Sequence, residues 1–249
     1  MNGISPKSLI AVSMHKAGSS VANRIILEFA KAKGYAIEQI TSAVAGSARS
    51  EESVFLEYAQ KLKPAGVYYG MARGPYVEKM PGIDALRVIV QVRDPRDCIT
   101  SLYYSWRESH VLPSNPEKRK VFEERREKVA STDIDSFARQ STQNYRNRLT
   151  IIADILARHP DCLLLTYEEM VGDTNAWLDR IGAFLDQPLT APLRAAIAKH
   201  ADFEVDGEDS ARHKRQVVPG DHARKLRPET VSHLTKALKA ELERFGYGQ

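Results

Sequence analysis

The stretch that indicates the fold is residues 13–24, SMHKAGSSVANR, which directly follow the apolar run 9–12. This order predicts a strand, then a tight turn that contains a lysine and a glycine, then a helix that opens on two serines. Backbone N–H groups and the helix dipole converge at such a turn, so it is suited to hold an anion. The alternative interpretation is an ordinary strand–helix junction with capping serines and a solvated lysine.

The spacing of the turn distinguishes it from the phosphate-binding loop of nucleotide triphosphatases. That motif consists of a glycine, four further residues and then Gly-Lys-Ser or Gly-Lys-Thr. Here Lys16 precedes Gly18, with Ala17 between them, and the upstream glycine is missing. The sequence therefore predicts an anion-binding loop of another kind.

The length and composition of the chain favour one α/β domain over residues 1–249. Its 249 residues are 43% hydrophobic, which is ample for a core. Cys98 and Cys162 lie far apart without metal-ligand spacing, which favours a reducing compartment over a disulfide framework or a zinc site. No apolar run has the length of a membrane span, and no signal peptide precedes the first strand. We therefore expect a cytoplasmic protein without stable membrane insertion.

The positive charge of the chain favours a polyanionic ligand. The formal net charge is +4 at pH 7, and the isoelectric point is about 9.0. The basic residues are spread over several segments, and no RNA- or DNA-binding motif accompanies them. The sequence thus favours a small phosphorylated ligand over a nucleic acid.

Strand-like and helical patterns alternate along the chain. Strand-like runs lie at residues 8–12, 67–69, 86–92 and 162–166. Helical patterns lie at residues 20–33, 51–62, 98–108, 118–129, 134–158, 175–185 and 229–245. This alternation predicts a central, mainly parallel sheet with helices on both faces. Ligands of such sheets bind at the carboxyl ends of the strands.

A second candidate anion site lies in residues 87–104, RVIVQVRDPRDCITSLYY. The apolar, β-branched run predicts a central strand that ends at Arg93, and the helix that follows carries Ser101 two turns further on. An arginine grips a phosphate with two hydrogen bonds, and a hydroxyl supplies one more donor. The alternative is that Arg93 pairs with Asp94 or Asp97 and only caps the helix.

A third candidate is the cation-rich stretch 213–226, HKRQVVPGDHARKL. Its composition and its Pro-Gly turn predict a mobile basic loop, followed by a helix that starts near Pro228. We expect a polyanion to order such a loop. The alternative is a solvated surface loop.

Together these segments resemble the sulfotransferase family, which transfers a sulfonate group from 3′-phosphoadenosine-5′-phosphosulfate (PAPS). MHKAGSSV resembles the family's 5′-phosphosulfate loop, usually Pro-Lys-Ser-Gly-Thr-Thr. The matching positions are Lys16, Gly18, Ser19 and Ser20, whereas His15 and Ala17 differ. VRDPRDCITS is similar to the 3′-phosphate motif, with Arg93 and Ser101 at its two phosphate-binding positions. The resemblance implies the α/β fold of this family, with one sulfotransferase-like domain over the chain.

The resemblance extends to the adenine site and to the basic loop. TYEEM, residues 166–170, resembles the family's Tyr-Glu-Asp segment, whose tyrosine, here Tyr167, contacts the adenine. HADF resembles the segment that supplies an adenine-stacking aromatic residue, here Phe203. RQVVPGD resembles the Arg-Lys-Gly…Gly-Asp-Trp motif, with Arg215 on its arginine. A shift of one residue pairs Lys214 and Arg215 with Arg-Lys instead, so both registers remain open.

The resemblance implies in-line transfer of the sulfonate, with adenosine 3′,5′-bisphosphate (PAP) as the product. Lys16 would stabilise the charge that builds on the bridging oxygen. The backbone of the loop, Ala17 included, and the hydroxyls of Ser19 and Ser20 would hold the phosphate end. The 3′-phosphate motif would separate PAPS from ATP. The sequence offers no carboxylate cluster for magnesium, so we expect a reaction without a metal.

The general base and the acceptor are less well defined. Many family members carry a histidine in a Lys-Thr-His segment, but GMARGPY, residues 70–76, has none. His110 is the first candidate because histidine titrates near neutrality, and a surface histidine is the alternative. Other branches of the family indicate Glu51 or Glu52. The acceptor, a hydroxyl or amine of a small molecule, glycan or lipid, remains open, as does the oligomeric state.

Two other classes of function remain open. One is a P-loop-type nucleotide kinase or NTPase with an aberrant loop, which would prefer ATP with magnesium. The other is a non-catalytic protein that binds a nucleotide or another polyanion. The charged run 116–129, PEKRKVFEERREKV, supports neither, because mixed charges at helical spacing indicate a solvated helix with internal ion pairs.

Overall fold

A computed structural model provides the structure of the chain, and it describes residues 5–47, 49–109, 112–201 and 217–248. Contacts between residues divide the chain into two compact units. The first unit consists of Met1–Val92 and Asp154–Asp202, and the second of Arg93–Ala153 and Phe203–Gln249. Each unit therefore draws on two separate segments of the chain. The single-domain organisation over residues 1–249 stays a prediction.

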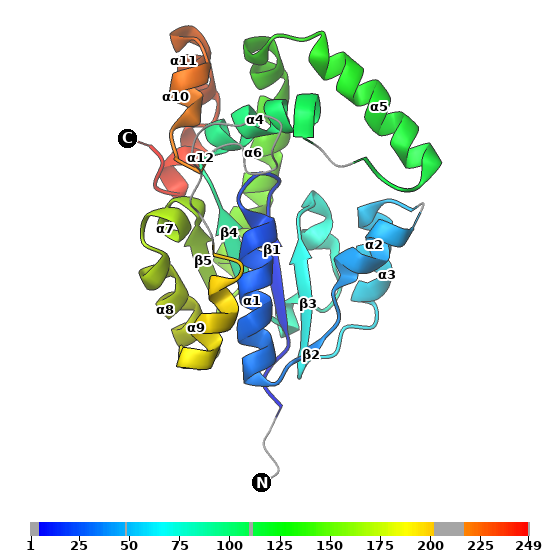
Figure 1. Cartoon of the computed structure of the whole chain (residues 1–249), viewed down its shortest axis with the longest axis vertical. Helices are drawn as coiled ribbons and strands as arrows, with labels where there is room; N and C mark the ends of the chain where they lie inside the picture. The colour runs from blue at the N-terminus through cyan, green and yellow to red at the C-terminus, as the bar shows by residue number, and fades with distance from the viewer. Residues whose placement is uncertain (1–4, 48, 110–111, 202–216, 249) are drawn as a thin grey trace. The chain divides into compact units, whose positions relative to one another are not determined.

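The first unit contains a five-stranded parallel sheet in the order β2-β3-β1-β4-β5 (Figure 1). The strands are β1 (Leu9–Ser13), β2 (Ala36–Ile37), β3 (Val67–Ala72), β4 (Arg87–Val92) and β5 (Cys162–Thr166). The central strand β1 pairs with β3 on one side and with β4 on the other, where Ser13 lies opposite Gln91. The sheet confirms the predicted α/β fold class.

The three middle strands form the core of the first unit. Every residue of β1 and β3 is buried, and so is every residue of β4 after Arg87. Val88, Ile89 and Val90 have no exposed surface. Near-continuous apolar strands are typical of parallel sheets that are covered on both faces. This burial explains why the apolar runs in the sequence located the strands.

Helices cover the sheet of the first unit. They are α1 (Ser19–Lys33), α2 (Ile40–Gly46), α3 (Glu51–Ala59), the 3₁₀ turns η1 (Pro75–Lys79) and η2 (Ile83–Ala85), α7 (Tyr167–Gly172), α8 (Thr174–Leu185) and α9 (Ala191–Ala198). The helix α1 lies against the sheet (Figure 1), contacts β3, α8 and α9, and buries Ile25, Ile26 and Phe29. It ends at Gly34, whose left-handed backbone (φ 87°) lets the N–H group of the next residue, Tyr35, donate back to the carbonyl oxygen of Ala30 at 3.0 Å.

The second unit is helical in its described part. Its segments are α4 (Pro95–Tyr104), the π-helical turn η3 (Ser105–Ser109), α5 (Pro116–Ala130), α6 (Ile134–Arg158), α10 (Asp221–Lys225), α11 (Pro228–Ala237) and α12 (Lys239–Arg244). The last residues of α6, from Asp154 on, belong to the first unit. Proline begins α4, α5 and α11, because its missing N–H is not needed at the first helical position. The charged helix α5 is largely exposed and contains the ion pair Arg119–Glu123 at 2.9 Å, as the sequence predicts.

The predicted elements are present with shifted ends. The expected strand 67–69 continues to Ala72 through Gly70, which has a φ of 79°. The expected helix 229–245 is interrupted at Leu238, between α11 and α12. The short elements β2, α2, α7, α9 and α10 were not predicted, because a few residues carry too little periodicity. Among the described helices, none combines the length and the apolar character that crossing a membrane requires.

Candidate active site

The turn between β1 and α1 has two residues in the left-handed backbone region. Lys16 has a φ of 70° and Gly18 a φ of 71°. A lysine in this region is strained by roughly 1–2 kcal/mol, so the surrounding structure must hold it there. Gly18 caps α1, and its carbonyl oxygen accepts from the N–H groups of Val21 and Ala22 at 3.0 Å. The turn therefore has a specific backbone shape, unlike an ordinary helix start.

Gly18 packs closely against α7. A Cβ atom on Gly18 would lie 2.7 Å from Cε of Met170 and 2.8 Å from Cδ2 of Tyr167. Both distances are shorter than van der Waals contact, so a side chain here would displace Met170 or Tyr167 and would also meet a backbone conformation that favours glycine. Tyr167 is the first residue of α7 and is buried. The structure thus brings together the predicted phosphosulfate loop and the predicted adenine-contacting tyrosine, which lie far apart in the sequence.

The N-terminal end of α1 is electropositive. Lys16 is half-buried in the preceding turn, and Ser19 and Ser20 are the first two residues of the helix. Arg73, the residue after β3, donates from Nε to Oγ of Ser19 at 2.8 Å. The first turn of α1, all of which the structure describes, contains no acidic residue. The helix dipole and the two cations therefore favour a negatively charged ligand.

The sequence analysis did not single out Arg73. The strand expected at residues 67–69 ended before Gly70, whereas β3 continues to Ala72 and puts Arg73 at the carboxyl end of a strand. The signal that would have located it is the one that located Arg93, a cation directly after a strand of a parallel sheet.

Gln91 supports the turn from the neighbouring strand β4. It is fully buried, and its Nε2 lies 3.4 Å from the carbonyl oxygen of Ala17, to which it donates a long hydrogen bond. Its Oε1 accepts from Nε1 of Trp177 at 3.3 Å, and its backbone oxygen accepts from the hydroxyl of Ser13 at 2.8 Å. Buried amides need hydrogen-bond partners. These contacts give both polar atoms of the Gln91 side-chain amide a hydrogen-bond partner, and they orient the carbonyl group of Ala17.

In the second unit, Arg93 belongs to a buried cluster around Asp97. The carboxylate of Asp97 is 0% exposed, and it accepts from Nη2 of Arg93 at 3.3 Å and from Nδ1 of His222 at 2.7 Å. The backbone N–H groups of Gly220 and His222 donate to it at 2.7 and 2.9 Å. Burial raises the pKa of Asp97, but the hydrogen bond from His222 and the charge of Arg93 lower it further and hold this pKa well below the usual range of an aspartate. The carboxylate is ionised, so the Nδ1 atom of His222 carries a hydrogen.

The structure shows which acid pairs with Arg93. Asp97 pairs with it at 3.3 Å and is one of the two acids that the alternative interpretation named. The helix cap is Asp94, whose side chain accepts from the backbone N–H of Arg96 at 2.8 Å and pairs with the Arg96 guanidinium at 2.7 Å. Ser101 lies half-buried on α4, in the same unit as Arg93. The cap of α4 therefore does not depend on Arg93.

The stretch 213–226 is not a loop throughout, and this corrects the prediction. Residues Asp221–Lys225 form α10, and His222 is buried. The contacts with Asp97 explain why this end is folded, because an ionised carboxylate holds two of its backbone N–H groups. The prediction of a mobile basic loop therefore does not hold for residues 221–225.

Several predicted site residues lie outside the part of the chain that the structure describes. Those outside the described residues are His110, Phe203, Lys214 and Arg215. Of the alternative bases, Glu51 accepts a hydrogen bond from the hydroxyl of Tyr76, and Glu52 pairs with Lys79 at 3.2 Å. Each glutamate is thus held by a neighbour in the first unit. In the part of the chain that the structure describes, no group of three or more His, Cys, Asp or Glu side chains is arranged to hold a metal ion.

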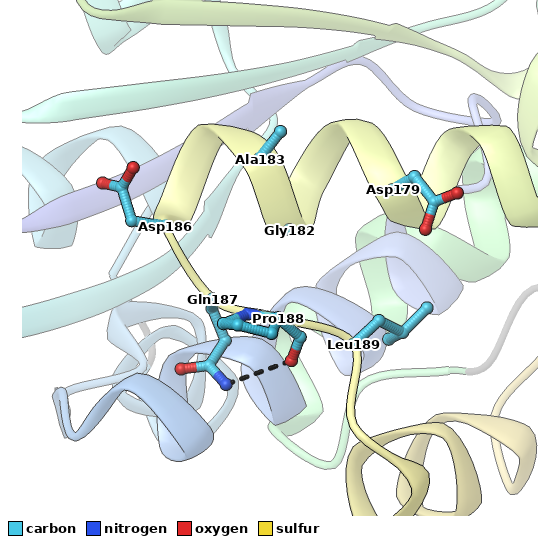
Figure 2. Close-up of a pocket in the computed structure, with 7 residues that line it drawn as sticks. All are labelled: Asp179, Gly182, Ala183, Asp186, Gln187, Pro188 and Leu189. Atoms are coloured by element: carbon cyan, nitrogen blue, oxygen red, sulfur yellow. Dashed lines mark hydrogen bonds between the residues drawn. The ribbon is translucent and has the colours of Figure 1, made fainter.

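Figure 2 shows a pocket of about 470 Å³ at the end of α8 and in the segment that follows it. Its lining residues are Asp179, Gly182, Ala183, Asp186, Gln187, Pro188 and Leu189. Its two charged side chains, Asp179 and Asp186, are both acidic, which disfavours an anionic ligand. None of the predicted site residues that the structure describes lines this pocket. We therefore do not assign it to the reaction.

A known protein family covers nearly the whole chain. The sulfotransferase domain family matches residues 6–244. The chain therefore belongs to the sulfotransferase family, and this confirms the predicted class of enzyme, one that transfers sulfonate groups. No curated protein matches the sequence.

Solved structures show the same fold. The mouse sulfotransferase SULT7A1, complexed with PAP, is 17% identical, with a TM-score of 0.67 over 97% of this chain and 86% of that chain. Retinol dehydratase, in complex with androsterone and the inactive cofactor PAP, is 16% identical, with a TM-score of 0.66 over 97% and 82%. The sulfotransferase STF9 from Mycobacterium avium is 12% identical, with a TM-score of 0.53 over 98% and 78%. At these identities the likeness shows the sulfotransferase fold.

Proposed function

We propose that this enzyme takes its sulfonate from PAPS and transfers it to a hydroxyl or amine of an acceptor. The observation that supports this best is the turn before α1, where Lys16 and Gly18 adopt left-handed backbones and Tyr167 packs on Gly18. These three residues match the phosphosulfate loop and the tyrosine segment of the family. The structures of SULT7A1 and retinol dehydratase contain PAP, which is what PAPS becomes after transfer.

Lys16 would act on the leaving group. When the acceptor attacks the sulfur atom, the bond from sulfur to the bridging oxygen breaks, and its electron pair stays on that oxygen. An ammonium group aimed at this oxygen stabilises the transition state. The N–H groups at the start of α1 and the hydroxyls of Ser19 and Ser20 would hold the phosphate. The acceptor's proton would pass to the general base.

Arg93 and Ser101 would bind the 3′-phosphate. Asp97 holds the Arg93 guanidinium by one of its Nη atoms, which restricts its orientation. An arginine binds phosphate oxygens through parallel hydrogen bonds, and the Ser101 hydroxyl would add a donor. Because AMP and ATP lack a 3′-phosphate, we expect this contact to select the donor. Tyr167 would contact the adenine.

The acceptor and the base complete the proposal. We keep His110 as the first candidate for the base, with Glu51 and Glu52 as alternatives. Retinol dehydratase binds androsterone in one structure and retinol in another, and we extend this class of small-molecule acceptor to this chain, with a glycan or lipid as the alternative. The proposal includes a cytoplasmic location, no metal and no nucleic-acid partner.

Thermal unfolding of the whole chain with and without PAP tests the donor. At a PAP concentration of 100 times Kd, linkage gives about 2.7 kcal/mol of stabilisation. For a chain of this length we expect an increase in Tm of roughly 5–10 °C. The increase should persist with a chelator, because the proposal invokes no magnesium. AMP and ATP should raise Tm much less.

Two outcomes would favour the alternative functions. An equal increase with ATP and magnesium would contradict the proposal and favour a kinase or NTPase. Binding of PAP without transfer from labelled PAPS to any member of a panel of alcohols, phenols and amines would favour a non-catalytic nucleotide-binding protein. Transfer to one member would identify the acceptor class.

A further inference from the structure

The side chain of Arg73 joins two elements at the carboxyl edge of the sheet. It follows Ala72, the last residue of β3, and its Nε donates to Oγ of Ser19, the first residue of α1, at 2.8 Å. Ser19 is 6% exposed, whereas Arg73 is half-buried. The hydrogen bond therefore holds a guanidinium against the end of α1 where the helix dipole is positive.

The segment after Arg73 holds its backbone in place. Tyr76 is buried in η1, and its hydroxyl donates to the carboxylate of Glu51 on α3. The rings of Tyr76 and Phe55 lie 5.1 Å apart, which anchors η1 on the same helix. A Cβ atom on Gly74 would come within 1.8 Å of the Tyr76 ring, so the chain between Arg73 and Tyr76 requires glycine. These contacts position Arg73 independently of any ligand.

The charges at this end of α1 add to one another. The helix N-terminus is equivalent to roughly half a positive charge, and Lys16 lies in the turn before it. The first turn, fully within the described residues, has no acidic side chain. A guanidinium is always charged, and its planar fork matches two oxygens of a tetrahedral oxyanion. The Ser19 hydroxyl, whose oxygen accepts from Arg73, still has its own hydrogen to donate.

We propose that Arg73, together with Ser19, binds the tetrahedral oxyanion at the 5′ end of the donor, its phosphate or its sulfonate. The inference rests on the proposed function and adds a residue to it. Lys16 acts on an oxygen that becomes charged as the bond breaks. Arg73 acts on oxygens that are charged before the reaction as well, so it contributes to binding more than to turnover.

Isothermal titration of the whole chain tests this assignment with three nucleotides. PAP and PAPS, without acceptor, carry a 5′ oxyanion, whereas adenosine 3′-monophosphate does not. We expect Arg73→Gln to lower the affinity for PAP or PAPS by roughly tenfold or more, as for a lost hydrogen bond to a charged group. The affinity for adenosine 3′-monophosphate should fall by less than about twofold. Arg73→Lys, which keeps the charge, should recover part of the loss.

A matched control is Arg139→Gln. Arg139 donates from Nη2 to Oγ1 of the buried Thr230 at 3.1 Å, so it too bonds a buried hydroxyl, but in the second unit. This variant should bind all three nucleotides as the wild type does. A loss confined to PAPS would assign Arg73 to the sulfonate, and equal losses for PAP and PAPS would assign it to the phosphate.

Two results would overturn the inference. One is an equal loss for all three nucleotides, which would make Arg73 a structural residue. The other is unchanged affinity for both PAP and PAPS. If Arg73→Gln lacks a cooperative thermal transition, it is not folded. The affinities of Arg73→Lys for the three nucleotides are then compared with those of the wild type by the same criteria. Failure of the wild type to bind PAP would instead remove the proposed function itself, so the two failures are distinguishable.

Discussion

The turn that follows β1 and the cluster around Asp97 each carry a predicted phosphate-binding cation, but they hold it differently. The turn consists of left-handed backbone and a helix N-terminus, with Lys16 and Arg73 adding positive charge. The cluster places Arg93 against an ionised carboxylate that accepts hydrogen bonds from two side chains and two backbone N–H groups. The turn gathers positive charges, whereas in the cluster the carboxylate of Asp97 offsets the charge of Arg93.

This difference separates function from stability. Removing a cation from the turn should affect mainly the ligand and the reaction. Removing the charge of Asp97 breaks up a buried, hydrogen-bonded ion pair, which is strongly destabilising. Two motifs that resemble the same family in sequence are therefore expected to respond differently to mutation.

The largest expected effect is on stability, from Asp97→Asn. The change keeps the shape of the side chain but removes its charge, so the hydrogen bonds that Arg93 and His222 donate to this buried side chain lose their ionised acceptor. We expect the free energy of unfolding at pH 7 to fall by about 3–5 kcal/mol, measured by urea denaturation. Glu123→Gln is the matched control, because Arg119–Glu123 is an exposed pair with the same i,i+4 spacing. It should cost at most about 0.5 kcal/mol.

The pH dependence of the same variant provides a second readout. The pKa of Asp97 is lower in the folded chain than in the unfolded chain, so its contribution is complete at neutral pH. It is lost as the pH falls below about 4, the ordinary range of an aspartate, towards the folded-state pKa. The difference between the wild type and Asp97→Asn should therefore shrink in acid. A constant difference would attribute the effect to packing and would contradict the charge argument.

The next effect is on turnover, from Lys16→Ala. Loss of charge stabilisation at the bridging oxygen should reduce turnover by about a hundredfold or more, measured with labelled PAPS and an acceptor that the wild type uses. PAP binding should survive in part, and the thermal stability of the free protein should change little. Lys31→Ala, in the last turn of α1, removes a lysine that pairs with Glu28 at 2.9 Å and should leave turnover unchanged. Normal turnover of Lys16→Ala would show that this turn is not the reacting site.

The smallest expected effect is a difference between two glycines. Gly34→Ala places a side chain at a left-handed position where no described atom lies within 4 Å, so it should cost only the backbone strain of roughly 1–2 kcal/mol. Gly18→Ala adds the overlap with Met170 and Tyr167, and we expect a further loss of roughly 1–3 kcal/mol. Urea denaturation of both variants measures the difference. Equal losses would show that α7 moves away without cost and that Gly18 is required for its φ alone.

Much of the fold could be predicted because the three middle strands of the sheet are buried. The apolar runs of β1, β4 and β5 and the periodicity of α6 leave clear patterns in the sequence. The strand β2 has two exposed residues, Ala36 and Ile37, and therefore leaves none. Gly70 interrupts the pattern of β3, and this single residue kept Arg73 out of the predicted site.

The candidate site was predictable where a motif is local. Lys16 and Gly18 fall within one short stretch, and the sequence indicated both. The contact between His222 and Asp97 joins residues 125 positions apart, and no local pattern encodes it. The same holds for the packing of Tyr167 on Gly18. The resemblance to the sulfotransferase family indicated both residues, but it did not indicate that they are in contact.

The central place of β1 in the sheet has a consequence for the energetics of the turn between β1 and α1, the proposed binding loop for the donor. Because β1 has a partner strand on each side, the loop that follows it is held from both, by Arg73 after β3 and by Gln91 in β4. Fixing the backbone of one residue costs about 1–2 kcal/mol of conformational entropy. Here that entropy is lost when the chain folds, so the loop is preorganised, and under the proposed function the donor would meet a shape that is already formed.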